Sequence, residues 1–482
     1  MKILIESSPA GRLEADALIV PIFEGRKEER FGAGDLCDSG EVSGKSLELT
    51  LLHHPPGIAA RRVLLAGAGK SEKYHPAELR KAVGAAVRLL KSKSIKKIAL
   101  LLDSASAGAD YVSAAVEGAL VGDFDPDRHK TGNDKKSLEE FLVVPSDGVT
   151  IPEFAVSRGR ILGEAQNYAR TLINEPPNLL TPSKMADAAR QTAADCGLEC
   201  DVLDRARMEE LGMGALLGVA QGSAEPPALI VLHYKPAQSA FNAHLGLVGK
   251  GVTFDTGGIS IKPADGMEKM KYDMAGGASM IGAMRAIAEL QPALAVSAFV
   301  PCVENMPGSR AQRPGDIVTA MSGKTIEVIN TDAEGRLILA DALTYARRLG
   351  CTHMVDAATL TGAVAVALGH LNVGLFANDD AMRDRVLAAA KAEGERMWPL
   401  PLEDDYKDYL KSAFADLANV GGRYGGAVTA AIFLREFAED TPWVHLDIAG
   451  TAWIDEAKPF ISKGPSGVAV RTFVRLATDW KD

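Results

Sequence analysis

The stretch Asn330-Thr331-Asp332-Ala333-Glu334-Gly335-Arg336 places two acids and an arginine on what the surrounding sequence predicts to be a turn. Residues 325–330 before it alternate with a β-branched bias and predict a strand, while Leu339, Leu343 and Ala346 behind it recur at helical spacing. Asp332 and Glu334 are therefore expected at the carboxyl end of a sheet, where open α/β folds build their sites. Such a concentration of charge needs a partner, and a bound cation is the simplest one.

Length and composition favour a protein with two domains. The chain has 482 residues, of which 47% are hydrophobic, and this is enough for two cores. Its net charge of −10, with both signs spread along the chain, argues against nucleic acid as the main partner. No apolar run is long enough to span a bilayer and the first residues resemble a strand, so we expect no membrane partner and a cytoplasmic location. The five scattered cysteines are interpreted as free thiols.

The pattern of strands and helices predicts two α/β regions. Residues 1–150 alternate strands and helices and are expected to form an N-terminal α/β domain, with an exposed polar loop at 123–137. Residues 151–174 are expected to be a linker helix, and 175–482 a larger domain with apolar strands buried on both faces. In the first domain, strands are expected at residues 2–6, 16–22, 62–66, 97–102 and 139–144, and helices at 76–90 and 111–120.

A second charged stretch supplies what the central turn needs. Lys250 lies at the end of a predicted apolar strand, and Asp255 precedes Thr256-Gly-Gly258, where missing side chains let a loop approach a ligand closely. Asp273 precedes two glycines at the start of a predicted helix. Each charged residue therefore lies at a break in hydrophobic structure, which is where functional sites tend to be.

The charges of both stretches together favour a pair of divalent cations. Two such ions about 3.5–4 Å apart repel by on the order of 20 kcal/mol at an effective dielectric of about 20, so bridging carboxylates are needed. The two stretches provide four acids for four positive charges, and this balance requires Lys250, if it is a ligand, to be a neutral amine. Lys262 and Arg336 would then leave a local positive excess that favours an anion or a developing oxyanion.

The same stretches resemble the leucine (cytosol) aminopeptidase family of two-metal exopeptidases. The resemblance rests on Asn330–Leu337, on Val248-Gly-Lys-Gly-Val-Thr-Phe-Asp-Thr-Gly-Gly258 and on Lys271-Tyr-Asp-Met-Ala-Gly-Gly277. Further matching motifs are Asn174-Glu-Pro-Pro-Asn178, Gly218-Val-Ala-Gln-Gly-Ser-Ala-Glu-Pro-Pro227, Ala358-Thr-Leu-Thr-Gly362 and His445-Leu-Asp-Ile-Ala-Gly450. These motifs are long and ordered, and they extend over essentially the whole second domain.

The resemblance implies a fold and a set of roles. The fold would be a smaller N-terminal macro-like α/β domain and a larger C-terminal αβα-sandwich catalytic domain with a mixed sheet. Five residues would hold two divalent ions per subunit, Mn²⁺ or Zn²⁺ with Mg²⁺ or Co²⁺ as alternatives: Lys250, Asp255, Asp273, Asp332 and Glu334. Lys262 would stabilise the oxyanion, and Arg336 would hold a bicarbonate as general base. The pocket for the first side chain would be lined by Met270, Thr359, Gly362, Ala449 and Ala452.

The reaction implied by the resemblance is the release of N-terminal, leucine-like residues from peptides by a homohexamer. Two alternatives stay open. A two-metal hydrolase of another class, such as a phosphoesterase, would need the same acids, and a DNA-binding or regulatory role would need a basic groove. A substrate with a blocked amine separates the first alternative from an aminopeptidase, and retained DNA affinity of a variant without Asp332 and Glu334 would reveal the second.

Overall fold

The structure is a computed structural model that describes residues 1–132 and 136–481, so part of the predicted loop 123–137 lies outside the described residues. The chain divides into two compact units, Met1–Asn167 with Asp455–Gly464, and Tyr168–Ile454 with Pro465–Asp482. The predicted continuous domain 175–482 is therefore interrupted. No local pattern marks this excursion, because residues 455–464 join the first unit through contacts distant in sequence. In the described part of the chain, no helix is long and apolar enough to cross a membrane.

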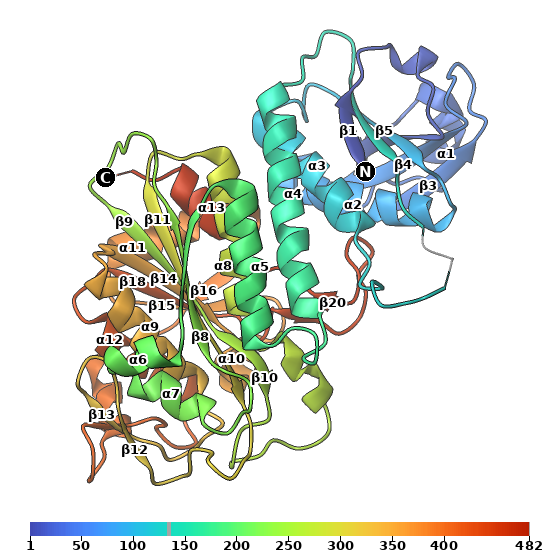
Figure 1. The fold of residues 1–482 in the computed structure, drawn as a ribbon. Helices are drawn as coiled ribbons and strands as arrows, with labels where there is room; N and C mark the ends of the chain where they lie inside the picture. Colours follow the sequence, from blue (N-terminus) through green and yellow to red (C-terminus); the bar gives the residue numbers. More distant parts are fainter. Residues whose placement is uncertain (133–135, 482) are drawn as a thin grey trace. The chain divides into compact units, whose positions relative to one another are not determined.

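The smaller unit is built on a six-stranded sheet that is parallel except for its last strand (Figure 1). The order is β1 (Lys2–Ile5), β6 (Glu140–Pro145), β5 (Lys97–Leu102), β2 (Ala17–Phe23), β4 (Arg62–Gly69) and β3 (Leu49–His53). Helices α2 (Pro76–Ser92) and α3 (Ala109–Asp123) pack against each other in this unit. The five predicted strands and two helices are confirmed. Strand β3 was not predicted, because this edge strand lacks an alternating pattern.

The long helix α4 (Glu153–Asn174) occupies the segment predicted as a linker helix. The boundary between the two units falls within this helix, after Asn167, so the helix belongs to both units. The sequence could not predict this boundary, because composition and helical spacing do not change within the helix.

The larger unit contains a mixed nine-stranded sheet, as the predicted fold class requires. The order is β16 (Met397–Pro399), β15 (Val373–Ala377), β18 (Trp443–Asp447), β14 (His353–Ala358), β9 (His244–Gly249), β11 (Ala295–Asn305), β8 (Ala228–Tyr234) and β7 (Glu199–Leu203), with β10 (Gly251–Asp255) also paired to β11. The four central strands β18, β14, β9 and β11 are parallel. Strand β15 pairs antiparallel with β18 and parallel with β16, and β8 and β7 pair antiparallel with their neighbours. The central strands are buried along nearly their whole length.

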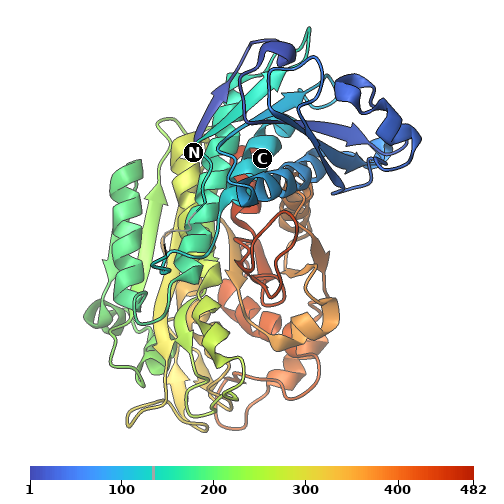
Figure 2. The same cartoon turned by 90° about the vertical axis from the view of Figure 1, so that its right-hand side faces the viewer.

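Two groups of helices cover this sheet. One group is α5 (Pro182–Cys196), α8 (Ala275–Leu290), α11 (Asp380–Glu393) and α13 (Val470–Thr478), and the other is α7 (Gly214–Ala220), α9 (Gly335–Arg348) and α12 (Gly426–Ala438). Helix α5 runs beside β7 and β8, the green elements at one side of the larger unit in Figure 2. Apolar strands that are buried on both faces need such cover from both sides, because each face removes apolar surface from water.

The central turn does not start from the main sheet, which corrects the expectation from sequence. The predicted strand 325–330 is only β13 (Thr325–Glu327), which pairs with β12 (Ile317–Thr319) and β17 (Leu417–Ala418) in a separate three-stranded sheet. Beyond β13, the amides of Ile329 and Asn330 donate to the Asn419 side chain instead of a neighbouring strand. The β-branched pattern identified the extended chain but could not show which sheet it joins.

Asp341 ties the helix α9 to two other segments of the larger unit, and its removal should destabilise the fold. Its buried carboxylate accepts backbone N–H groups from Leu216 at 2.8 Å and from Met321 at 2.7 Å, one on each oxygen. In Asp341→Asn, an N–H₂ group faces one of these donors, so we expect a loss of about 1–3 kcal/mol in the free energy of unfolding. Urea titration at pH 8 measures it, with exposed Asp405→Asn as the control; equal midpoints for both variants would contradict this account.

A half-buried histidine pair should make stability fall in mild acid. Ser297 Oγ lies 2.7 Å from His233 Nδ1 and 2.7 Å from His244 Nε2, so one hydroxyl connects both rings. Burial lowers the pKa of His233 and of His244. The unfolded chain therefore binds more protons than the folded chain below pH about 6.5, and stability is lost as the pH falls from 7 to 5. We expect a shallower loss in a His233→Gln, His244→Gln variant, measured by urea midpoints across this range; an unchanged pH slope would exclude the pair as its source.

Candidate metal centre

Lys250 occupies a break between β9 and β10, two strands that run in succession along β11. Its side chain is buried, and its ammonium lies 2.8 Å from Asp273 Oδ2 and 2.7 Å from Glu334 Oε1. Gly335 makes room for this side chain, because a Cβ at Gly335 would lie 2.8 Å from Lys250 Nζ. Gly276 lets two backbone segments approach each other, because a Cβ there would lie 2.0 Å from the Ala357 carbonyl oxygen and 3.0 Å from Lys250 N. The motif glycines therefore let a long side chain reach the centre of the larger unit.

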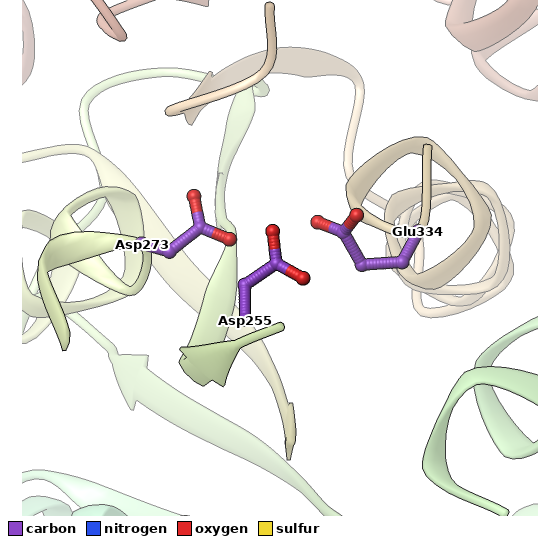
Figure 3. A group of neighbouring side chains, drawn as sticks. All are labelled: Asp255, Asp273 and Glu334. Atoms are coloured by element: carbon purple, nitrogen blue, oxygen red, sulfur yellow. The ribbon is translucent and has the colours of Figure 1, made fainter. Parts of the chain in front are cut away.

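Three carboxylates point toward one another (Figure 3), and two of them contact Lys250. Asp255 ends strand β10, Asp273 follows the short 3-10 helix η4 (Met267–Tyr272), and Glu334 precedes the first residue of α9. One oxygen from each carboxylate lies within 4.8 Å of the others, and all three residues are buried. Acids drawn from three elements in this way form a set of oxygen ligands of the kind that hard divalent cations prefer.

Lys262 and Asp332 complete the cluster on its more exposed side. Lys262 Nζ lies 2.8 Å from Asp255 Oδ2 and also contacts Asp332 Oδ1. The side chains of Lys262 and Asp332 are 21% and 32% exposed, compared with 3% for Asp255, so they are the members that solvent can reach. All five predicted metal ligands and the predicted oxyanion group therefore lie in one connected cluster.

The donor set fits divalent cations. The cluster holds four carboxylates against two lysine ammonium groups, which leaves two negative charges in a mostly buried site. Glu334 Oε2 is buried and makes no hydrogen bond to any residue that the structure describes. Since a buried carboxylate oxygen without a partner is costly, this oxygen is expected to have a cationic ligand. Three of the predicted ligands, Asp255, Asp273 and Glu334, lie close enough together to hold an ion.

Protonation opposes metal binding in this cluster. Burial raises the pKa of Asp273 to about 8, although the ammonium of Lys250 acts in the opposite direction. Burial also raises the pKa of Glu334, with a contribution from Asp255. For Lys250 burial favours the neutral amine, but the carboxylates of Asp273 and Glu334 outweigh it and raise the lysine pKa. A metal ion must therefore displace protons here, and its affinity weakens as the pH falls.

Two asparagines that sequence reasoning missed hold the cluster from outside. The buried Asn305 side chain donates to Asp255 Oδ1 at 2.8 Å and to the carbonyl of Thr331 at 3.0 Å, so it joins the two charged stretches. The fully buried Asn419 side chain donates to the carbonyl of Asn330 at 2.7 Å. The sequence could have singled out Asn305, because it is a polar residue at the end of a buried strand. No sequence feature marks Asn419.

Arg336 is buried beside the cluster without contacting a ligand carboxylate through any described bond. Its Nη1 donates to the carbonyl of Asn419 at 2.7 Å, and its Nε is buried without a hydrogen-bond partner among the described residues. Burial lowers the arginine pKa to about 10, against the raising effect of Glu334. A buried guanidinium with a free N–H is suited to binding a small planar anion.

The five predicted pocket residues lie in different environments. Thr359 is buried and donates its hydroxyl to Asp273 Oδ1 at 2.6 Å, so it supports a metal ligand in addition to any role in a pocket. Met270 is half-buried in η4, and Gly362 is exposed at the start of α10 (Gly362–Leu368). Ala449 is half-buried against an apolar cluster that includes Val364 of α10. Ala452 is 1% exposed. Their shared role as a side-chain pocket stays a prediction.

Comparison with known proteins identifies both units. A family model described as the catalytic domain of the cytosol aminopeptidase family matches residues 167–474, and one described as the N-terminal domain of that family matches residues 19–133. A probable cytosol aminopeptidase of Solibacter usitatus is 75% identical over 481 residues, which cover 100% of both chains. One of Koribacter versatilis is 51% identical, with 99% of each chain covered.

Solved structures agree with these sequence matches. The bottromycin maturation enzyme BotP in complex with Mn is 36% identical and has a TM-score of 0.87, covering 96% of this chain and 99% of that one. A tomato leucine aminopeptidase mutant is 34% identical and has a TM-score of 0.89, covering 100% of this chain and 97% of that one. The resemblance seen in the sequence is thus confirmed over both units: the chain belongs to the cytosol aminopeptidase family and is a metal-dependent aminopeptidase.

Proposed function

We propose that this enzyme releases N-terminal, leucine-like residues from peptides through a dinuclear metal centre that activates water. One observation carries the proposal: four carboxylates and two lysines from separate elements meet at one point, and Glu334 Oε2 there is buried without a hydrogen-bond partner among the described residues. Four carboxylates match the charge of two divalent ions when Lys250 binds as the neutral amine. Mn²⁺ or Zn²⁺ fits these ligands, with Mg²⁺ or Co²⁺ as alternatives.

Each predicted ligand would have its own role in binding the two ions. Asp255 and Glu334 would be shared between the two ions, as the resemblance to the family implies. Asp255 contacts Lys262, Glu334 contacts Lys250, and an oxygen of each lies within 4.8 Å of the other. Lys250 would bind as the neutral amine, after losing the proton that it shares here with Asp273 and Glu334. Bound divalent ions supply Lewis-acid activation of a water and an anchor for the free amine of the substrate.

Two further cations of the chain would act on substrate and water. Lys262 lies on the exposed side of the cluster, where its ammonium can donate to the oxygen of a tetrahedral intermediate. Arg336 would hold a bicarbonate as general base, and its buried, unpartnered Nε supports that role. Met270, Thr359, Gly362, Ala449 and Ala452 would line an apolar pocket for the first side chain.

We also propose a cytoplasmic homohexamer that acts on peptides rather than on nucleic acid. The name of the relatives, cytosol aminopeptidase, supports the location. Large apolar side chains that water reaches in the single chain support an assembly surface: Val366, Phe414 and Tyr424 are 90%, 77% and 74% exposed. The net charge of −10 supports peptides over nucleic acid as the main partner.

The substrate amine and the metal should both be required for activity. We expect turnover of leucine amide to be lost on chelation and to return on adding Mn²⁺ or Zn²⁺, because the carboxylate cluster alone cannot activate water. We expect N-acetyl leucine amide to be inert, because its nitrogen cannot bind a metal ion. Steady-state rates with both substrates check this. Turnover of N-acetyl leucine amide, or turnover of a phosphate ester, would favour a two-metal hydrolase of another class. Undiminished turnover of leucine amide after chelation would refute the role of the metal.

Removing the Lys262 ammonium should slow catalysis more than it weakens metal binding. We expect Lys262→Ala to lower kcat by about 10²–10³-fold, which is the usual effect of losing one oxyanion donor. Metal content per subunit, measured by elemental analysis, should remain that of the wild type because the carboxylates persist. Lys184→Ala on the exposed face of α5 is the matched control and should keep the wild-type rate. A wild-type kcat in Lys262→Ala would exclude the role.

A further inference from the structure

Asp447 is a buried acid that lies behind the metal cluster and contacts none of the predicted ligands in any described bond. It ends strand β18 and is 1% exposed, directly across from Ala358 at the end of β14. Its Oδ2 accepts the hydroxyl of Thr361 at 2.6 Å, and its Oδ1 accepts the backbone N–H of Leu360 at 3.2 Å. The carboxylate therefore fixes the chain immediately after β14.

That same segment touches two metal ligands. Thr359 is its first residue, and its carbonyl accepts the ammonium of Lys250 at 2.9 Å. Its hydroxyl donates to Asp273 Oδ1 at 2.6 Å and to the Asp273 carbonyl at 3.0 Å. A continuous path of hydrogen bonds and one short backbone segment thus runs from Asp447, through Leu360 and Thr359, to the two ligands.

The path reaches only one side of the cluster. Asp255 and Thr331, on the other side, are joined by Asn305, which belongs to a different strand. Hydrogen-bonded groups behind metal ligands set ligand orientation, and their loss typically lowers metal affinity by about 10–100-fold. Disturbing Asp447 should therefore affect the ion position that includes Asp273 and Lys250 more than the position that includes Asp332.

We propose that Asp447 is a positioning residue, which acts through Thr359 to orient Asp273 and Lys250 for one of the two metal ions. The inference rests on the proposed dinuclear function. Its basis is hydrogen bonding, since the hydrogen-bond partners of Asp447 are a hydroxyl and backbone amides. An asparagine could keep this pattern by donating its amide to Thr361 Oγ1 while its oxygen accepts the Leu360 N–H.

Glu395 offers a matched control for loss of a buried carboxylate. It accepts the hydroxyl of Thr472 at 2.5 Å and the backbone N–H groups of Thr472 and Ala469 at 3.2 and 3.0 Å. One threonine hydroxyl and backbone amides bind Glu395 as they bind Asp447, and Arg471 Nη2 also lies 3.4 Å from Glu395 Oε1. These partners belong to α13 and the residue before it. Glu395→Ala should destabilise the fold without a directed effect on the metal cluster.

The experiment titrates metal-free full-length protein with Mn²⁺ and follows free Mn²⁺ by electron paramagnetic resonance. We expect wild type to bind two ions per subunit, and Asp447→Ala to bind one of them at least about 10-fold more weakly. Asp447→Asn and Glu395→Ala should bind both ions within about twofold of wild type. With saturating Mn²⁺, Asp447→Ala should regain most of its kcat, since no group that contacts substrate has been removed.

The outcomes separate the inference from the function on which it rests. Fewer than two ions bound to wild type would overturn the proposed dinuclear centre itself. Two ions in wild type, with Asp447→Ala binding both as tightly as Glu395→Ala does, would overturn only the positioning role. If circular dichroism shows that Asp447→Ala does not fold, Thr361→Val takes its place, because it removes the 2.6 Å hydrogen bond and leaves Asp447. Weaker binding of one ion by Thr361→Val would then support the positioning role, and binding of both ions as tightly as in Glu395→Ala would overturn it.

Discussion

The burial of like charges at one point is the constraint on which the larger unit depends. Asp255, Asp273 and Glu334 each bring an oxygen to within 4.8 Å of the others, and their mutual repulsion must be offset for the chain to fold. The ammonium groups of Lys250 and Lys262 provide part of this compensation. The same compensation is incomplete by two charges, so the fold that tolerates the cluster also makes it a cation site.

The scaffold meets this constraint by drawing the charged residues from different elements. Lys250 comes from the break between β9 and β10, Asp273 from the entry to α8, and Glu334 from the entry to α9. Each acid is then supported by a separate buried polar group: Asn305 behind Asp255, Thr359 behind Asp273, and Asn419 behind the turn that carries Glu334. Rigid support of this kind keeps the acids together despite their repulsion.

Much of the site could be predicted from the sequence because its charged residues lie together in a few short segments. Two acids and an arginine within the central turn, and Lys250 with Asp255 and Asp273 at breaks in apolar structure, pointed to one centre without any coordinates. Most strands and helices followed from apolar periodicity in the same way. Among the failures were edge strand β3, which lacks alternation, and the short β13, whose pattern did not reveal the small sheet it joins.

The sequence by itself determined the family, the reaction class and the identity of the charged residues, because local strings of side chains carry that information. Only the tertiary structure decided which residues support them. Asn419 bonds to Asn330 across 89 positions, and Asp447 bonds to Thr361 across 86. Residues 455–464 likewise join the first unit only through distant contacts. Such pairings leave no periodic or compositional trace, since hydrogen-bond partners are chosen by where the folded chain brings polar groups together in the absence of water.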